Sequence, residues 1–280
     1  SMIKTILVIG GAGYIGANAC KAIKHSGREP VVFDNHSSGH RHAVKWGDII
    51  EGDIRNEAEI RAALDRVRPD AVMHFAANIE VGQGEKDPGA FYENNVAGTL
   101  NTVRAMLALR LQNFIFSSTC AIYGDPERLP LVEDMPKRPV SVYGRSKLMV
   151  ETILEDLSRA EGLRYAALRY FNAAGADLEG EVGEEHDPET HLIPNALKAA
   201  AGIGSGMKLF GDDYPTPDGT CMRDYIHIAD LATAHILAAE HIDKTGESLQ
   251  LTLGTGNGIT VKQVLDSVER AVGRPVPVEV

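Results

Sequence analysis

The sequence lacks the features that would place it in a membrane or on nucleic acid. It contains no apolar run as long as a membrane span, and no charged-then-apolar signal segment opens it, so we expect a cytoplasmic protein. Acidic residues outnumber basic ones by 39 to 28, which gives a net charge of −11. This charge disfavours nucleic acid and anionic membrane surfaces as partners.

Cysteine is also scarce. Cys20, Cys120 and Cys221 are far apart, odd in number and without a Cys-x-x-Cys spacing, which excludes a disulfide framework and a cysteine zinc site. Ten histidines are present, and from them we predict no metal site. With 280 residues, 44% hydrophobic and 24% charged, the chain suits one large soluble domain, or a domain and a smaller one.

The N-terminal part of the chain carries a glycine-rich turn between a strand and a helix. The apolar, β-branched run Ile3–Ile9 predicts a buried parallel strand, which breaks into Gly10-Gly-Ala-Gly13-Tyr-Ile-Gly16. A helix is predicted over residues 14–26, with Gly27 at its C-terminal cap, and a second strand over residues 29–33. A strand, glycine turn, helix and strand in this order indicate a dinucleotide-binding βαβ unit.

Each of these residues has its own physical role in such a unit. Gly10 permits the tight turn, Gly13 lets a pyrophosphate approach the backbone N–H groups at the helix N-terminus, and Gly16 allows the helix to pack closely on the strand. Asp34 ends the second strand and can accept hydrogen bonds from both ribose hydroxyls. A 2′-phosphate would meet this negative charge, and the neighbouring Asn35 is not basic, so we predict NAD rather than NADP.

Strands and helices continue to alternate along the chain. This alternation predicts an α/β fold with a Rossmann-type doubly wound parallel sheet, whose ligands lie outside the carboxyl ends of the strands. Asp53, Ala77 and Thr119 are predicted to lie at such ends. Further strands are predicted over residues 48–52, 71–76, 113–118, 163–170, 207–210, 223–227 and 249–253. Helices are predicted over residues 57–67, from Asp87-Pro88 onward, from His191-Leu-Ile-Pro194 onward, and over 230–242 and 261–272.

The composition changes to Gly, Glu, Asp and Pro over residues 173–189, which we interpret as a domain boundary. We predict a NAD-binding Rossmann domain over residues 2–175 and a smaller α/β domain over residues 176–280 for the substrate. Part of residues 225–260 is expected to pack back on the first domain.

Tyr143 and Lys147 stand four residues apart at the start of a predicted helix, with Ser141 as its N-cap. This spacing places both side chains on one helix face, where an ammonium can favour the ionised form of a phenol, as a general base requires. The first turns of this helix are expected to face outward. A Tyr-x-x-x-Lys pair is more often an aromatic side chain on the core with a solvated cation beside it, so the pair needs support from a cofactor site.

That support comes from eight short motifs that follow one another in the chain: Gly10–Gly16, His74-Phe-Ala-Ala77, Asn94-Asn95, Ser117-Ser-Thr119, Tyr123-Gly124, Tyr143-x-x-x-Lys147, Arg169-Tyr-Phe-Asn172 and Arg223-Asp-Tyr-Ile-His227. Together they resemble the extended short-chain dehydrogenase/reductase superfamily, and within it the family of UDP-glucose (UDP-galactose) 4-epimerases. The resemblance covers residues 3–277. It implies NAD-dependent 4-epimerisation of a UDP-hexose, in which C4 is transiently oxidised and the hydride returns to the opposite face.

The resemblance also implies roles for single residues. Tyr143 matches the base that takes the proton of the sugar 4-hydroxyl, Lys147 matches the lysine that binds the nicotinamide ribose and lowers the pKa of the tyrosine, and Thr119 matches the residue that hydrogen-bonds the same oxygen. The implied NAD contacts are Gly10, Gly13, Tyr14, Ile15, Gly16, Asp34, Asn35, Asp53, Ile54, Phe75, Ala76, Ala77, Asn94, Lys147 and Tyr170. The implied UDP-sugar contacts are Thr119, Tyr143, Phe171, Asn172, His191, Leu192, Lys208, Leu209, Phe210 and Arg223.

Among the substrate residues, Arg223 is the best candidate to bind a diphosphate, because a guanidinium can contact phosphate oxygens in pairs. A surface ion pair with Asp224 is the structural alternative. Members of the family continue past the position of Val280, so we expect the substrate domain to be incomplete at its C-terminus. The residue that gates acceptance of N-acetylated sugars lies in that continuation.

Other functions remain possible on these motifs. UDP-N-acetylglucosamine and UDP-pentose 4-epimerases share them, as do related nucleotide-sugar dehydratases and decarboxylases. A dehydratase needs an acidic pair after Thr119, where this chain has Cys120 and Ala121. A NAD-sensing protein without catalysis would lack Tyr143 and Lys147, and an ordinary alcohol dehydrogenase would not explain the Arg223 motif. The resemblance further implies a homodimer formed through the helices at residues 95–110 and 143–161.

Overall fold

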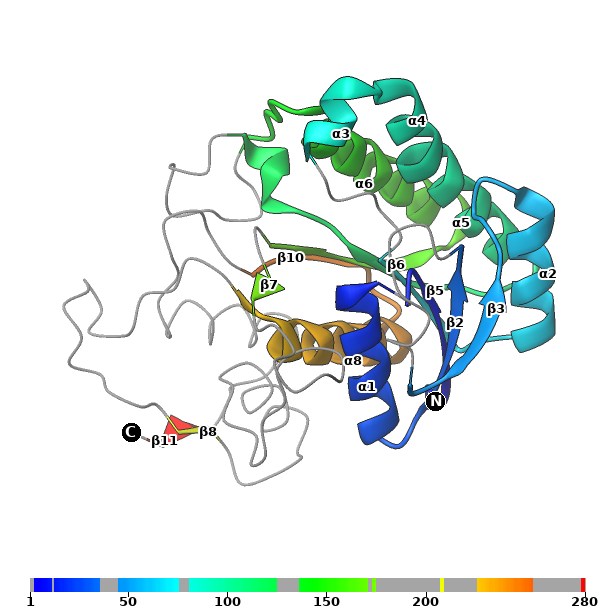
Figure 1. Cartoon of the computed structure of the whole chain (residues 1–280). Coiled ribbons are helices and arrows are strands. Elements are labelled where there is room, and N and C mark those ends of the chain that lie inside the picture. Colours follow the sequence, from blue (N-terminus) through cyan, green and yellow to red (C-terminus); the bar gives the residue numbers. More distant parts are fainter. Residues whose placement is uncertain are drawn as a thin grey trace.

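A parallel sheet of seven strands forms the centre of the protein (Figure 1). The computed structural model describes residues 3–11, 13–35, 45–75, 81–124, 136–170, 173–174, 207–208, 226–253 and 278–279. The strand order is β10-β6-β5-β4-β1-β2-β3. Successive strands are added on one side of β1 as far as β3 and on its other side from β4 onward, so the order changes side between β1 and β4. This is the doubly wound Rossmann topology that the sequence predicts, and its switch point is where such sheets bind ligands.

The strands follow the apolar runs of the sequence, but several are shorter than predicted. The seven strands of the sheet are β1 (Thr5–Ile9), β2 (Glu29–Asp34), β3 (Asp48–Glu51), β4 (Ala71–His74), β5 (Asn113–Ser117), β6 (Arg164–Arg169) and β10 (Leu249–Thr252). Two parallel pairs form separate two-stranded sheets: β7 (Ala173–Ala174) with β9 (Ile226–His227), and β8 (Met207–Lys208) with β11 (Val278–Glu279). The helix predicted to open at His191-Leu-Ile-Pro194 and the helix predicted over residues 261–272 lie outside the described residues.

Helices cover both faces of the sheet (Figure 1). On one face, α1 (Tyr14–His25) packs beside α8 (Ile228–Thr245), and Ile6 and Val8 of β1 contribute to their shared core. On the other, α2 (Glu57–Val67), α5 (Gly98–Ala108) and α6 (Val142–Glu161) share a core with Leu7 and Ile9. Successive residues of β1 therefore belong to opposite cores, as the period of a strand requires.

The segment before α5 is one helical run with an irregular turn. Asp87 caps α4 (Pro88–Tyr92) by accepting a hydrogen bond from the Ala90 N–H at 3.2 Å, so the predicted start at Asp87-Pro88 is confirmed. A π-helical turn over Glu93–Ala97 then leads into α5. Such turns are rare and occur mostly at functional sites.

Helix α6 begins as predicted but is oriented differently. The Ser141 hydroxyl accepts a hydrogen bond from the Gly144 N–H at 3.0 Å, which confirms the N-cap. The expectation that the first turns face outward is wrong, because Val142, Ser146 and Lys147 are buried. The cause is a close approach between elements: a Cβ on Gly144 would lie 2.8 Å from the Ala121 carbonyl oxygen in the 3-10 turn that follows β5.

Late segments of the chain complete the sheet. β10 pairs with β6 in parallel, from Leu249 opposite Ala166 to Thr252 opposite Arg169. Helix α8 packs against β5, β6 and α1. The proposed division into two domains stays a prediction. Among the described helices, none combines the length and apolar character needed to cross a membrane.

Candidate active site

Ser117 at the end of β5 contacts Lys147, and Thr119 two residues later contacts Tyr143; both partners are predicted to be catalytic. The Ser117 carbonyl oxygen accepts a hydrogen bond from Lys147 Nζ at 2.7 Å, and the Ser117 hydroxyl lies 2.5 Å from the Tyr170 hydroxyl. The Thr119 hydroxyl hydrogen-bonds the Tyr143 side chain. Thr119, Tyr143 and Lys147 are therefore brought together at the carboxyl end of the sheet, where a Rossmann fold places its ligands.

Lys147 is buried beneath the tyrosine. Its side chain approaches two aromatic rings, with Nζ 4.6 Å from the centroid of Phe116 and 5.8 Å from that of Tyr143. Only 3% of the residue is exposed. An ammonium over a ring face is attracted by the ring quadrupole, and this contact together with the Ser117 carbonyl compensates part of its lost hydration.

In the protein without cofactor, burial shifts the pKa values of both Tyr143 and Lys147. It raises the pKa of Tyr143 to about 12, although the hydrogen bond from Thr119 favours the phenolate. It lowers the pKa of Lys147 to about 7, although the Glu151 carboxylate favours the ammonium. The implied lowering of the tyrosine pKa is therefore not a property of the protein alone, because desolvation of the phenolate outweighs the favourable contacts.

The glycine turn has the geometry that the sequence predicts. Gly10 adopts a φ of 82° and donates a hydrogen bond to the Phe33 carbonyl at 3.0 Å. A Cβ on Gly16 would lie 2.2 Å from the Gly10 carbonyl oxygen, so no other residue fits there. At Gly13 the nearest protein atom to such a Cβ is 3.4 Å away, so the protein itself does not require glycine at this position.

The N-terminus of α1 fits a pyrophosphate. Gly13 is its N-cap and makes no side-chain cap hydrogen bond, and the first turn contains no acidic residue. Tyr14 is 43% exposed beside it. The N-terminus of a helix attracts anions through its backbone N–H groups and its dipole. Asp34 ends β2 and is 9% exposed, which suits the ribose role predicted for it.

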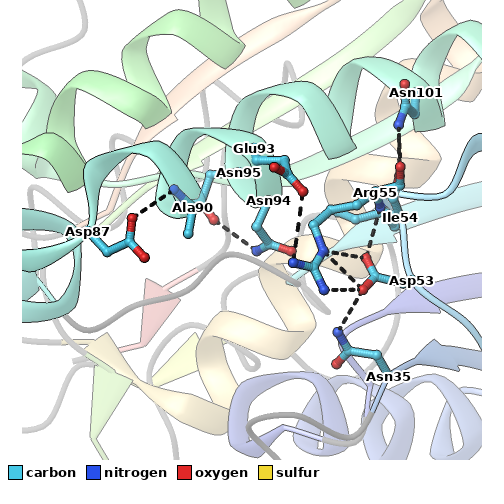
Figure 2. A network of polar contacts seen from close by, with 10 residues as sticks. All are labelled: Asn35, Asp53, Ile54, Arg55, Asp87, Ala90, Glu93, Asn94, Asn95 and Asn101. Atoms are coloured by element: carbon cyan, nitrogen blue, oxygen red, sulfur yellow. Dashed lines mark hydrogen bonds and ion pairs between the residues drawn. The ribbon is translucent and has the colours of Figure 1, made fainter.

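A polar network extends from the end of β2 to the π-helical turn (Figure 2). Asp53 accepts hydrogen bonds from Asn35 Nδ2 at 3.5 Å and from the Arg55 guanidinium at 2.5 Å, and Arg55 in turn lies 4.0 Å from the Glu93 carboxylate. The hydrogen bond from Arg55 lowers the pKa of Asp53. A hollow of about 900 Å³ borders Asp53, Arg55 and Glu93 rather than Tyr143. Sequence reasoning included Asn35 and Asp53 but missed Arg55 and Glu93.

The π-helical turn also connects to the catalytic helix. Asn94 Nδ2 donates to Asn95 Oδ1 at 3.0 Å, and Asn95 Nδ2 donates to the Ser146 hydroxyl at 3.4 Å. Ser146 in turn donates to the Tyr143 carbonyl at 2.8 Å. Asn95 is therefore a supporting residue of the site, although the sequence predicts a cofactor contact only for its neighbour Asn94.

Some of the remaining residues predicted to contact NAD or the UDP-sugar lie among the described residues, and others do not. Ile54 is buried against α5, and Phe75 packs against the ring of His235 at 4.8 Å between centroids. Ile15 lies in the first turn of α1, and Tyr170 directly follows β6. Lys208 lies in β8, where only the backbone is described. The predicted residues outside the described ones are Ala76, Ala77, Phe171, Asn172, His191, Leu192, Leu209, Phe210 and Arg223.

No group of three or more His, Cys, Asp or Glu side chains is arranged to hold a metal ion among the residues that the structure describes. His36 and His40 do have the i,i+4 spacing of a helical metal site, which the prediction of no metal overlooks. Both lie outside the described residues, so that prediction stays untested there.

Comparison with known proteins identifies the class of protein that this fold and site define. The model of the NAD dependent epimerase/dehydratase family matches residues 6–254, and the chain belongs to this family. The relatives are more particular. A UDP-glucose 4-epimerase of Rhizobium leguminosarum bv. trifolii is 53% identical over 276 residues, which are 99% of this chain and 84% of that protein. One from Rhizobium meliloti is 53% identical over 270 residues, 96% of this chain and 82% of that protein.

Solved structures agree with this assignment. The crystal structure of UDP-glucose 4-epimerase from Brucella ovis in complex with NAD is 51% identical and superposes with a TM-score of 0.74, over 99% of this chain and 85% of that one. The enzyme from Bifidobacterium longum in complex with NAD+ and UDP is 36% identical with a TM-score of 0.72, over 99% of this chain and 85% of that one. The described part of the chain therefore has the epimerase fold.

Proposed function

We propose that the chain is a UDP-glucose 4-epimerase that uses NAD. Its reaction interconverts UDP-glucose and UDP-galactose by inverting C4 of the hexose, with no net oxidation. One observation carries the proposal: the Thr119 hydroxyl and the buried Lys147 ammonium both approach Tyr143 at the carboxyl end of the sheet. The identity of 53% to enzymes of this name supports the choice of substrate.

Tyr143 is proposed as the base that accepts the proton of the 4-hydroxyl and later returns it. Thr119 orients the reacting oxygen by sharing its hydrogen bond with Tyr143. Lys147 favours the phenolate by its positive charge and is held in place by the Ser117 carbonyl. Bound NAD would supply reversible acceptance of the C4 hydride, and its oxidised ring would add a second positive charge to the site. Two positive charges oppose the effect of burial on the pKa of Tyr143.

The cofactor is proposed to be held by the groups at the switch point of the sheet. The N–H groups at the start of α1 bind its pyrophosphate, Asp34 and Asn35 its ribose, and Asp53 the adenosine end of the molecule. Asn94 and Tyr170 complete the proposed contacts with the described residues. The nucleotide sugar is assigned to Phe171, Asn172, His191, Leu192, Lys208, Leu209, Phe210 and Arg223 on the family resemblance alone.

A direct assay tests this function. The chain is incubated with UDP-galactose and NAD, and the products are separated by chromatography; we expect UDP-glucose to accumulate until the equilibrium ratio is reached. The Tyr143→Phe variant serves as the matched control for contaminating enzymes. Failure of the unmodified chain to form UDP-glucose, with NAD bound, would contradict the proposal.

A broader sugar specificity is the second candidate. Similar structures include a UDP-Glc/GlcNAc 4-epimerase from Campylobacter jejuni, 38% identical with a TM-score of 0.69. The same assay with UDP-N-acetylglucosamine and with a UDP-pentose distinguishes the alternatives. A dehydratase is disfavoured, because Cys120 after Thr119 is fully buried and Ala121 has no ionisable group. A 4-keto-6-deoxy product in place of an epimer would favour it.

We also propose a homodimer in the cytoplasm, formed through the surfaces of α5 and α6. Met149 on α6 is 44% exposed and offers an apolar side chain for such a contact. Sedimentation at micromolar concentration is expected to give twice the mass of the chain, and Met149→Glu to weaken the association. A monomer mass for the unmodified chain would refute this assembly.

A further inference from the structure

A buried ion pair lies one helical turn beyond Lys147 and has no part in the function proposed above. Glu151 of α6 and Arg169 at the end of β6 are 5% and 2% exposed. Arg169 Nε lies 3.1 Å from each carboxylate oxygen, and Nη2 lies 2.5 Å from Oε1. This two-pronged geometry fixes the carboxylate in one orientation.

Further contacts tie this pair to three other segments. The Ser118 hydroxyl donates to Glu151 Oε2 at 2.6 Å. Arg169 Nη1 donates to the Tyr123 hydroxyl at 2.8 Å, and the hydroxyls of Tyr123 and Thr252 are 2.9 Å apart. Removing two charges from water is costly, and buried pairs are not retained for stability as a rule. The cluster therefore calls for a role besides packing.

The position of Lys147 suggests that role. Residues 147 and 151 lie on the same face of α6, four positions apart. The end of β5 holds both of them with consecutive residues: the Ser117 carbonyl binds the ammonium, and the Ser118 hydroxyl binds the carboxylate. The geometry thus fixes a carboxylate one helical turn after Lys147 in α6, while Tyr143 lies one turn before it.

The other charged or titratable groups around Lys147 do not supply this negative charge. Burial lowers the pKa of His74 to about 3 and that of His235 to about 4, and it raises the pKa of Tyr170, so all three are neutral near pH 7. Arg169 is positive. These groups come from four elements: Tyr143 and Glu151 from α6, His74 from β4, Arg169 and Tyr170 from the end of β6, and His235 from α8.

We propose that Glu151, held by Arg169 and Ser118, is a positioning residue of the active site. It supplies the counter-charge that keeps the Lys147 ammonium protonated and in place on the Ser117 carbonyl. This inference rests on the function proposed above, because it assigns Glu151 an effect on the base only through Lys147. The opposing effects of burial and of Glu151 on the pKa of Lys147 agree with it.

The pH dependence of turnover tests the proposal in the full chain with NAD bound. In Glu151→Gln the amide keeps the shape of the side chain but no longer favours an ammonium. We expect the alkaline limb of kcat to move to lower pH by about 1 unit. Glu151→Asp keeps the charge and is expected to restore the limb toward the wild-type position. A purely structural residue would lower kcat by the same factor at every pH.

Glu151→Gln leaves the charge of Arg169 uncompensated, which can impair folding. The double variant Glu151→Gln/Arg169→Gln removes both charges together and is expected to show the same displaced limb. Tyr123→Phe is the matched control, because it removes the hydrogen bond to Arg169 and keeps every charge. An unmoved limb in the double variant, or an equal shift in Tyr123→Phe, overturns the proposal.

A direct titration separates this inference from the proposed function. The Nζ signal of Lys147 can be followed by NMR in ¹⁵N-lysine-labelled protein without sugar, and assigned with Lys147→Met. We expect Lys147 to lose its proton at a lower pH in the double variant than in the wild type. Absence of epimerisation by the wild type would defeat the proposed function but leave this measurement valid. Identical titrations in a protein that epimerises normally would defeat only the inference.

Discussion

Lys147 Nζ donates a hydrogen bond of 2.7 Å to the carbonyl oxygen of Ser117, which joins the catalytic helix α6 to the end of β5. This contact means that the ammonium is held by the backbone of the sheet and not by a flexible side chain. A carbonyl on a central strand moves little, so the distance from Lys147 to Tyr143 is fixed before any ligand binds. Preorganised charge of this kind is what stabilises a developing phenolate.

The first prediction concerns the base. Tyr143→Phe removes the group that accepts the proton, so kcat should fall by about 10²–10⁴-fold, while NAD remains bound. Turnover of UDP-galactose and NAD content by absorbance are the measurements. Tyr165→Phe is the matched control, because it removes another buried hydroxyl, bonded to Gln250, outside the site. Wild-type turnover in Tyr143→Phe would refute the assignment.

The second prediction concerns the stability cost of the buried ammonium in the protein without cofactor. The pKa of Lys147 falls from 10.5 to about 7 on folding, so between these values the unfolded chain binds the extra proton. Stability therefore rises with pH across this window, and the penalty is complete below it. Lys147→Met should be more stable than wild type by about 2 kcal/mol at pH 6, with a difference that shrinks toward pH 10. Urea unfolding at several pH values measures it, and a constant difference would contradict the burial effect.

The third prediction separates two glycines of the turn. Gly16→Ala places a Cβ 2.2 Å from the Gly10 carbonyl oxygen, so the variant should be destabilised by at least about 2 kcal/mol. Gly13→Ala meets no protein atom closer than 3.4 Å, so stability should change by less than about 1 kcal/mol. The methyl group introduced by Gly13→Ala would nevertheless fill the space through which the pyrophosphate reaches the N-terminus of α1. The affinity for NAD should therefore fall at least about tenfold. Calorimetry of NAD binding checks this, and unchanged affinity would remove Gly13 from the site.

The fourth prediction concerns acid sensitivity. Burial, and then the charge of Lys147, lower the pKa of His74 from 6.5 to about 3, and its Nε2 lies 3.1 Å from the Thr99 hydroxyl. Between these pH values the unfolded chain binds the proton, so stability is lost as the pH falls. His74→Gln should reduce the slope of the unfolding free energy against pH, between about pH 3 and 6.5, by about 1.4 kcal/mol per pH unit. His235→Gln is the companion variant, for which the same effect is expected between pH 6.5 and about 4. Parallel stability curves for wild type and His74→Gln would argue against the neutral buried histidine.

The parts of the structure that depend on local sequence were predictable. The Rossmann order, the turn at Gly10, the cap at Ser141 and the start at Asp87 follow from apolar periodicity and turn chemistry within a few residues. The pair Tyr143 and Lys147 was found for the same reason, since helix spacing alone relates them.

The parts that depend on contacts between distant segments were not predictable. The sequence places Arg169 in a motif, but nothing in one sequence indicates that it pairs with Glu151, which lies on another element. The burial of Lys147 was missed because it arises from the close packing of Gly144 on the 3-10 turn. The π-helical turn at Glu93–Ala97 has no sequence signature as plain as a glycine or a proline.

The pairing of β10 with β6 has a consequence for how the protein is made. The chain leaves the sheet after Arg169 and supplies its last strand only at Leu249–Thr252, with α8 arriving just before it. On the ribosome, the edge of β6 and the face that α8 covers therefore stay open until about residue 253 has emerged, although the glycine turn is made early. Pauses in translation within residues 171–225 would prolong the exposure of an unpaired strand edge, which is the state most prone to aggregate.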